Sequence, residues 1–248
     1  MPRSLRESIV AAALFLGLSA LAYLVFTSSA YKADWETVWE RRESLWSGFL
    51  VTLFVSIGAL LVAVIVSVLL VCGQRTWSKV LTAACQGYIE LIRGTPLLVQ
   101  LLIGYYVFAP AFNLNSPLLA GVIVLACFSA AYLAEIIRGG IDSIPNAQRE
   151  AARAVGFTTA QAYRFVIIPQ TIRRILPAAA GEFANLIKNS SLLSVIAVSE
   201  ITKEVRDANA ITYVAFEFYL PLALGYLILT IPIAIVARRL EARFAYAT

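Results

Sequence analysis

The sequence predicts an all-α integral membrane protein with about six transmembrane helices. Of its 248 residues, 60% are hydrophobic and only 14% are charged, whereas soluble domains usually carry about a quarter charged residues. The apolar residues gather in blocks about 20 residues long, which is the length that a helix needs to cross a hydrocarbon core of roughly 30 Å. Histidine is absent, which excludes His-assisted nucleophiles and His-ligated metals or haem.

Six apolar blocks account for the predicted spans. The first follows Arg3 and Arg6, as a signal peptide would, but it is long for that role and shows no clear cleavage site, so we expect an uncleaved helix. The fifth is interrupted by several polar residues. The blocks cover residues 9–26, 48–72, 80–109, 117–137, 177–198 and 219–237.

The segment between the first two spans is expected to lie on the outer membrane surface. Trp35, Trp39 and Trp46 follow one another there at a helix-compatible spacing, and tryptophan is enriched at membrane–water interfaces. Residues 1–46 are therefore interpreted as an N-terminal transmembrane helix followed by an extracytoplasmic amphipathic segment.

Basic residues near the span ends predict the orientation, because Lys and Arg are enriched on the cytoplasmic side. With six spans both termini lie on one side, and the larger group of basic residues lies there too, so we expect cytoplasmic N- and C-termini. The same placement explains the net charge of +5 without nucleic-acid binding. The group comprises Arg3, Arg6, Arg75, Lys79, Arg138, Arg149, Arg153, Arg164, Arg173, Arg174, Arg238, Arg239 and Arg243, against Lys32, Arg41, Arg42, Lys203 and Arg206 opposite.

A polar segment, residues 143–174, separates the fourth and fifth spans. Pro145 suits the first turn of a helix, Ser143 is close enough to cap it, and Gly156 is placed to end it. The predicted helix is about ten residues long, far too short and polar to span. It is either an ordinary cytoplasmic loop or a low-relief surface, rich in alanine, that another protein approaches closely.

The same segment resembles the EAA loop of ABC importer permeases. The resemblance rests on Glu150-Ala151-Ala152, on Gly156, and on Val166-x-Ile168-Pro169, where the family pattern has Ile and Leu in place of Val166 and Ile168. Three further blocks resemble the polar amino acid uptake subfamily, which includes histidine, glutamine, glutamate and arginine types. They are "YIELIRGTPLLVQ" (88–100), "AYLAEIIRGGIDSIPNAQ" (131–148) and "LIKNSSLLSVIAVSEIT" (186–202).

The resemblance implies a permease subunit of a binding-protein-dependent importer in the bacterial inner membrane, which moves its solute by alternating access. It covers roughly residues 47–244, which implies a five-helix permease domain there and an extra N-terminal helix before it. The EAA segment would be the cytoplasmic coupling helix that docks on an ATPase. The residues implied in coupling are Gln148, Arg149, Glu150, Ala151, Ala152 and Gly156.

The implied partners are a second permease subunit, identical or related, two cytoplasmic ATPase subunits and an extracytoplasmic solute-binding protein. The sequence contains no G-x-x-x-x-G-K-[ST] phosphate loop, so we expect the partner ATPase to bind ATP and Mg and this chain to be neither an enzyme nor a cofactor carrier. Cys72, Cys85 and Cys127 lie within spans at no ligand spacing, which favours packing over a metal site.

Charged residues at membrane depth are costly and usually face a protein interior or a water-filled path. In the third span, Glu90 and Arg93 stand at i, i+3 and are predicted to form a structural pair, before a kink or break at Gly94 and Pro96. The other polar residues either join helices, as a Glu135–Lys188 pair would, or line a path for a zwitterion. The candidate path residues are Tyr132 and Glu135 in the fourth span, and Glu182, Asn185, Lys188 and Asn189 in the fifth.

Two other functions remain as alternatives. A secondary transporter or channel working alone would be expected to show inverted repeats, and none is evident. An intramembrane enzyme without histidine would need a Ser–Lys or Asp–Asp pair, and only Ser190 or Ser191 near Lys188 offers one.

The resemblance to the uptake subfamily does not define the solute. It is compatible with basic, acidic and neutral amino acids and with opine-like solutes.

Overall fold

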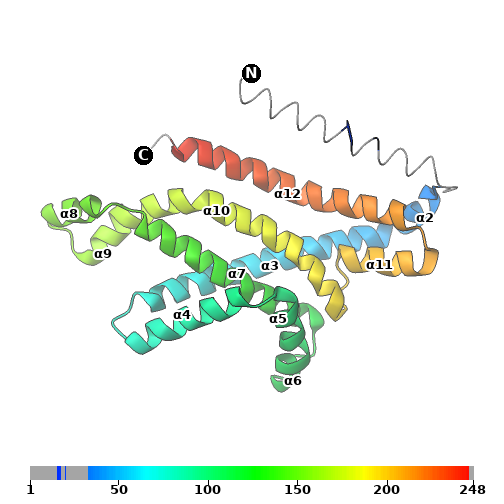
Figure 1. The fold of residues 1–248 in the computed structure, drawn as a ribbon, viewed down its shortest axis with the longest axis horizontal. Helices are drawn as coiled ribbons and strands as arrows, with labels where there is room; N and C mark the ends of the chain where they lie inside the picture. Colours follow the sequence, from blue (N-terminus) through cyan, green and yellow to red (C-terminus); the bar gives the residue numbers. More distant parts are fainter. Residues whose placement is uncertain (1–15, 18–19, 21–32, 246–248) are drawn as a thin grey trace.

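The computed structural model describes residues 33–245 together with residues 16, 17 and 20. The predicted first span, residues 9–26, thus lies almost wholly outside the described residues. Helices make up nearly all of the described chain and run mostly along the long axis of the molecule (Figure 1). The α-helices are α2 (Trp35–Glu40), α3 (Arg42–Gln74), α4 (Lys79–Gly94), α5 (Leu97–Ile103), α6 (Ala109–Ala111), α7 (Pro117–Asp142), α8 (Asn146–Ala154), α9 (Thr159–Ala162), α10 (Ile168–Asn189), α11 (Ile201–Thr212) and α12 (Ala215–Ala245).

Three described helices, α3, α7 and α12, are long and apolar enough to cross a membrane. They correspond to the predicted second, fourth and sixth spans. α10, with 22 residues, is about 33 Å long at 1.5 Å per residue, but its polar side chains keep it out of that group. The all-α membrane fold is confirmed, while the total of six spans stays a prediction.

The third predicted span is broken. α4 and the segment Leu97–Ala111 meet at 109°, so residues 80–109 form an elbow rather than one straight helix. The break falls at Gly94 to Pro96, as the sequence predicts. The Gln100 side-chain amide turns back to donate to the Ile92 carbonyl (2.7 Å) and to the Thr95 hydroxyl (2.8 Å), which itself donates to the Leu91 carbonyl (2.9 Å). Two carbonyls that the break would leave unpaired in the membrane are thereby satisfied.

The fifth predicted span has different ends. α10 starts at Ile168 rather than at Pro177, with Pro169 in its first turn and Pro177 inside the helix. It gives way to a 3₁₀ segment, Ser190–Ile196, which ends at Ala197 with φ of 64°. The apolar run, residues 177–198, therefore covers only the second part of α10 and the 3₁₀ segment, because the residues before Pro177 continue the helix without a break.

The core lies where α3 packs on α7. The side chains that α3 buries there are small, which lets the two backbones approach closely, as is usual between membrane helices. Leu125, Leu133, Leu186 and Leu193 fill the space around them. The small buried residues are Thr52, Ser56, Ala59, Ala63 and Ser67 on α3 and Ala126, Ala130, Ala131 and Ala134 on α7.

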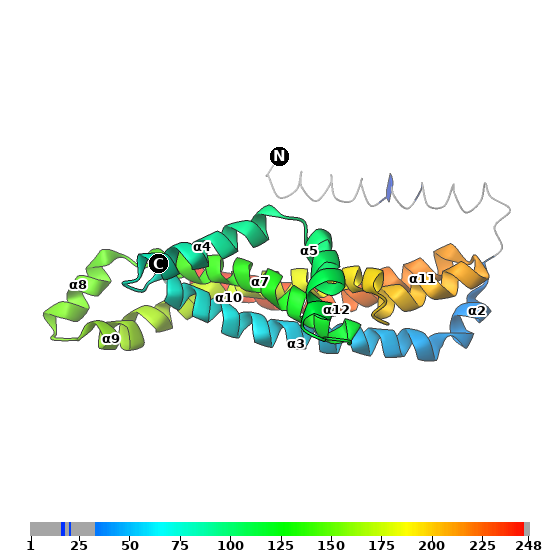
Figure 2. The same ribbon diagram turned by 90° about the horizontal axis from the view of Figure 1, so that it is seen from below.

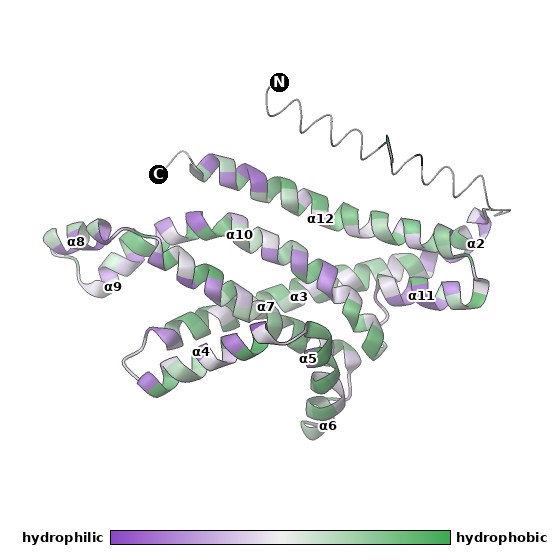
Figure 3. Ribbon diagram, in the orientation of Figure 1, coloured by the Kyte–Doolittle hydropathy of each residue, from purple (hydrophilic) through white to green (hydrophobic). Residues whose placement is uncertain are grey.

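The polar elements lie at the two ends of the molecule. α8, α9 and the C-terminal end of α12 are at one end, and α2 and α11 are at the other (Figures 1 and 2). Hydrophilic residues gather on α8, on α11 and at the end of α12, while α3, α5 and the middle of α12 are mostly hydrophobic (Figure 3). The structure thus separates the segments expected on opposite membrane sides, while their orientation stays a prediction from charge.

Gly48 allows α11 to approach α3 closely. A Cβ atom at Gly48 would lie 3.0 Å from the Cα atom of Ile201 and 2.8 Å from Cγ of Glu204, whereas one at Gly58, on the same helix, would meet nothing closer than 4.0 Å. We expect Gly48→Ala to lower the free energy of unfolding by about 1–3 kcal/mol through overpacking. Gly58→Ala should be neutral or stabilising by up to about 1 kcal/mol through helix propensity. Thermal unfolding in detergent would compare them, and equal stabilities would contradict the close approach.

Candidate functional site

α8 is a short helix that ends in a glycine turn. It begins after Pro145 and runs for nine residues. Gly156 follows with φ of 84°, its N–H donates to the Arg153 carbonyl (2.9 Å), and the Phe157 N–H donates to the Ala152 carbonyl (3.0 Å). These two bonds define a Schellman motif, which requires a left-handed residue at the position of Gly156. The predicted helix and its glycine terminator agree with the structure.

The predicted N-cap is wrong. Pro145 occupies the N-cap of α8 and no side chain caps the helix, whereas Ser143 belongs to the end of α7 and its hydroxyl donates to the Gly140 carbonyl (2.7 Å). The reason is that α7 extends to Asp142, beyond the predicted end of its apolar run. Ser143 therefore ends α7 and is not available to cap α8.

The α8–α9 unit projects beyond the ends of α7 and α10 (Figures 1 and 2). Of the residues predicted to couple to an ATPase, Gln148, Glu150, Ala151 and Gly156 are exposed. Ala152 is buried, at 4% exposure, and Arg149 is half-buried. The segment thus has a free surface that combines small residues with polar and charged ones, Arg153 among them, and an inner face that packs on the rest of the chain.

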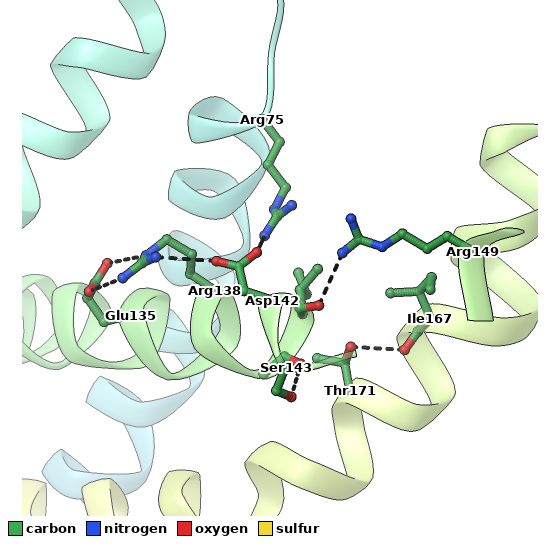
Figure 4. A network of polar contacts seen from close by, with 10 residues as sticks. Arg75, Glu135, Arg138, Asp142, Ser143, Arg149, Ile167 and Thr171 are labelled. Carbon is green, nitrogen blue, oxygen red and sulfur yellow. Dashed lines mark hydrogen bonds and ion pairs between the residues drawn. The ribbon is translucent and has the colours of Figure 1, made fainter. Parts of the chain in front are cut away.

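A chain of ion pairs runs along the end of α7 (Figure 4). Asp142 pairs with Arg75 (2.6 Å) and with Arg138 (3.3 Å). Arg138 pairs in turn with Glu135 (2.8 Å), and Glu135 also pairs with Arg93 (3.2 Å). The Arg93 guanidinium lies 5.5 Å from the ring centre of Tyr132, within the range of a cation–π contact. These contacts join α3, α4 and α7.

The predicted Glu90–Arg93 pair is not formed in this structure. Among the described residues, the ion pair of Arg93 is with Glu135, and Glu90 accepts a hydrogen bond from the Gln86 amide (3.3 Å). Both side chains line a cavity of about 360 Å³ between α3, α4 and α7. The spacing i, i+3 permitted the local pair, but α7 places a carboxylate within reach of Arg93. The cavity is lined by Gln74, Thr82, Gln86, Ile89, Glu90, Arg93, Glu135 and Arg138.

The polar residues of α10 divide into a buried and an exposed set. Glu182, at 7% exposure, accepts a hydrogen bond from the hydroxyl of Ser129 on α7 (2.7 Å). Asn185 and Lys188 are exposed, and Asn189 is half-buried. Glu135 is held by arginines rather than by Lys188, so the structure forms two polar groups, not one cluster.

One buried carboxylate was not expected from the sequence. Glu200 is fully buried at the N-terminus of α11, where it accepts hydrogen bonds from the Lys203 N–H (2.9 Å) and the Tyr226 hydroxyl (3.0 Å). Burial raises the pKa of the Glu200 carboxyl, and these hydrogen bonds oppose that change. Glu200 lies just beyond a predicted span, where a carboxylate in the sequence gives no sign of burial.

The sequence and the fold both match known proteins. The family model for binding-protein-dependent transport system inner membrane components matches residues 70–246. The probable glutamine ABC transporter permease protein GlnM of Bacillus subtilis (strain 168) is 37% identical over 79% of this chain and 91% of its own. The glutamine transport system permease protein GlnP of Escherichia coli (strain K12) is 34% identical over 85% of this chain and 97% of its own.

A solved structure of an amino acid transporter also matches this chain. The crystal structure of an amino acid ABC transporter with histidines has a chain that is 36% identical, with a TM-score of 0.79. The match covers 86% of this chain and all of the other.

Proposed function

The chain belongs to the family of binding-protein-dependent transport system inner membrane components, and on that premise we propose that it is the permease subunit of an ATP-driven importer of polar amino acids. The observation that carries the proposal is α8, a short, glycine-terminated helix that stands free at one end of the spanning helices. Its exposed surface is accessible to a partner protein.

The energy for transport comes from a partner, since this sequence has no phosphate-binding loop. Two cytoplasmic ATPase subunits bind ATP and Mg, and α8 docks on one of them. A second permease subunit, identical or related, completes the membrane part, and an extracytoplasmic binding protein delivers the solute. Closure of the ATPase pair then moves α8 and switches the permease between its inward- and outward-facing states.

The solute path follows the polar residues of α7 and α10. A zwitterionic amino acid carries both charges, so a path through the membrane requires both signs nearby. Glu182 supplies a buried carboxylate and Lys188 an exposed ammonium on one side of α10. The proposed path residues are Tyr132, Glu135, Glu182, Asn185, Lys188 and Asn189.

Reconstitution tests the proposed function. A tag on this chain should co-purify an ATPase and a permease subunit from the native host, identifiable by mass spectrometry. Vesicles containing the complex should take up labelled glutamine only with internal ATP and external binding protein. Competition by arginine, glutamate, histidine and an opine would define the solute. Uptake that an ion gradient drives without ATP would instead favour a secondary transporter.

The orientation in the bacterial inner membrane gives a separate prediction. Single cysteines at Glu36 and Ala210, both exposed, should react with an impermeant thiol reagent in spheroplasts lacking the three native cysteines. A cysteine at Gln148 should react only after the membrane is opened, because α8 faces the cytoplasm in this proposal. Labelling of Gln148 from outside would overturn the orientation.

A further inference from the structure

The last turn of α7 receives side chains from three other elements. Arg149 of α8 donates to the Ile141 carbonyl (3.3 Å), and Arg174 of α10 donates to the Ser143 carbonyl (2.6 Å). Arg75, which follows α3, pairs with Asp142 (2.6 Å). Figure 4 shows Arg75 and Arg149 reaching the same short stretch of α7 from different sides. This group of contacts is called the α7 junction below.

Helix geometry explains why arginines gather there. The last four carbonyls of a helix lack helical partners, and the C-terminal end carries a partial negative charge. A guanidinium satisfies both needs, and it holds its carbonyl more firmly than a neutral donor would. The α7 junction therefore consists of charge-assisted contacts that join the end of α7 to α8, to α10 and to the residue after α3. The Ile141 carbonyl accepts from the Ile144 N–H as well as from Arg149.

Arg149 points into the protein and away from the free surface of α8. The side chain is half-buried, and its Nε atom is buried with no hydrogen-bond partner among the described residues. Arg153, one turn later on α8, is exposed. The two arginines of the EAA segment thus have different surroundings, and only Arg153 is available to a docking partner.

We infer that Arg149 and Arg174 are positioning residues that transmit the displacement of α8 to α7 and α10. The inference rests on the proposed function, because it assigns the elements through which the coupling helix acts. Both bonds end on backbone carbonyls of α7, so α7 moves as α8 moves. Asp142, Arg138, Glu135 and Arg93 continue the connection from the α7 junction to the wall of the polar cavity.

The experiment compares uptake per ATP hydrolysed in vesicles containing the whole transporter. In Arg149→Met and Arg174→Met this ratio should fall by up to about tenfold, the loss expected from one charge-assisted hydrogen bond, and in the double variant, which removes two such bonds, it should fall further. Arg149→Lys and Arg174→Lys keep a charged donor and should restore most of it. Arg173→Met is the matched control, since Arg173 is the exposed neighbour on α10 and should leave the ratio unchanged.

Affinity for the ATPase separates positioning from docking. Arg149→Met should bind the ATPase subunits as tightly as the unaltered chain does, whereas Arg153→Met should bind them more weakly. An unchanged transport ratio in the double variant, or a loss explained entirely by weaker ATPase binding, would overturn the inference. If the unaltered transporter shows no ATP-dependent uptake, the proposed function fails first, before any variant is compared.

Discussion

Gly156→Val is expected to abolish solute uptake while the chain still inserts and folds in the membrane. Gly156 has φ of 84°, and an added Cβ would meet no atom within 4 Å, so the whole cost comes from the backbone. A left-handed conformation costs an ordinary residue about 1–2 kcal/mol and a β-branched residue more. The Schellman turn would open and α8 would lose its fixed angle to α9.

Gly156→Asn is the control, because asparagine tolerates the left-handed region and should keep most of the uptake. Uptake and ATP hydrolysis would be measured together in vesicles. The valine variant should hydrolyse ATP without transport or fail to bind the ATPase. Normal coupling in Gly156→Val would mean that α8 is an ordinary loop helix. Glu150→Lys, which reverses an exposed charge on α8, should give the same uncoupling without strain.

Lys188→Met is expected to reduce uptake by at least about tenfold, the effect of removing one ionic contact to the solute. The side chain is exposed on α10 and forms no salt bridge within 4 Å in the described chain, and its charge interaction there is with Glu182, itself a proposed path residue. Lys188→Arg keeps the charge and should retain most of the uptake. The measurement is initial uptake rate across a solute series, together with the yield of assembled complex.

Glu135→Gln provides the comparison. It removes the carboxylate that two arginines share, so a loss of stability is expected in addition to any change in solute preference. If Lys188→Met lowers the yield of complex as much as it lowers uptake, Lys188 joins subunits and does not line the path. Reduced uptake with a normal yield supports the path.

Local chemistry made α8 predictable. Pro145 and Gly156 bracket a run of strong helix formers, and each acts through its own backbone geometry, without help from distant residues. The spans at α3, α7 and α12 were predictable for a similar reason, because apolar length alone defines them. The contacts that these helices make with other helices could not be predicted in the same way.

The partner of Arg93 could not be predicted from the sequence. Glu90 lies three residues before Arg93 and is the obvious partner. The sequence does not show that Glu135, 42 positions after Arg93, comes closer in the folded protein. The inward direction of Arg149 could not be predicted either, since its acceptor is a backbone carbonyl of another helix. The start of α10 was misplaced because Pro177, a usual helix boundary, is accommodated inside the helix.

The elbow between α4 and α5 has a consequence for how the protein is made. α4, with 16 residues, is about 24 Å long, and Leu97–Ala111 is about 22 Å long, so neither arm spans the roughly 30 Å hydrocarbon layer. α4 packs on α3, which is synthesised before it, and both arms pack on α7, which is synthesised after them. Part of the surface that supports the elbow is therefore still missing when this segment leaves the ribosome. The packing of residues 79–111 is complete only once α7 is in place, despite their early position in the chain.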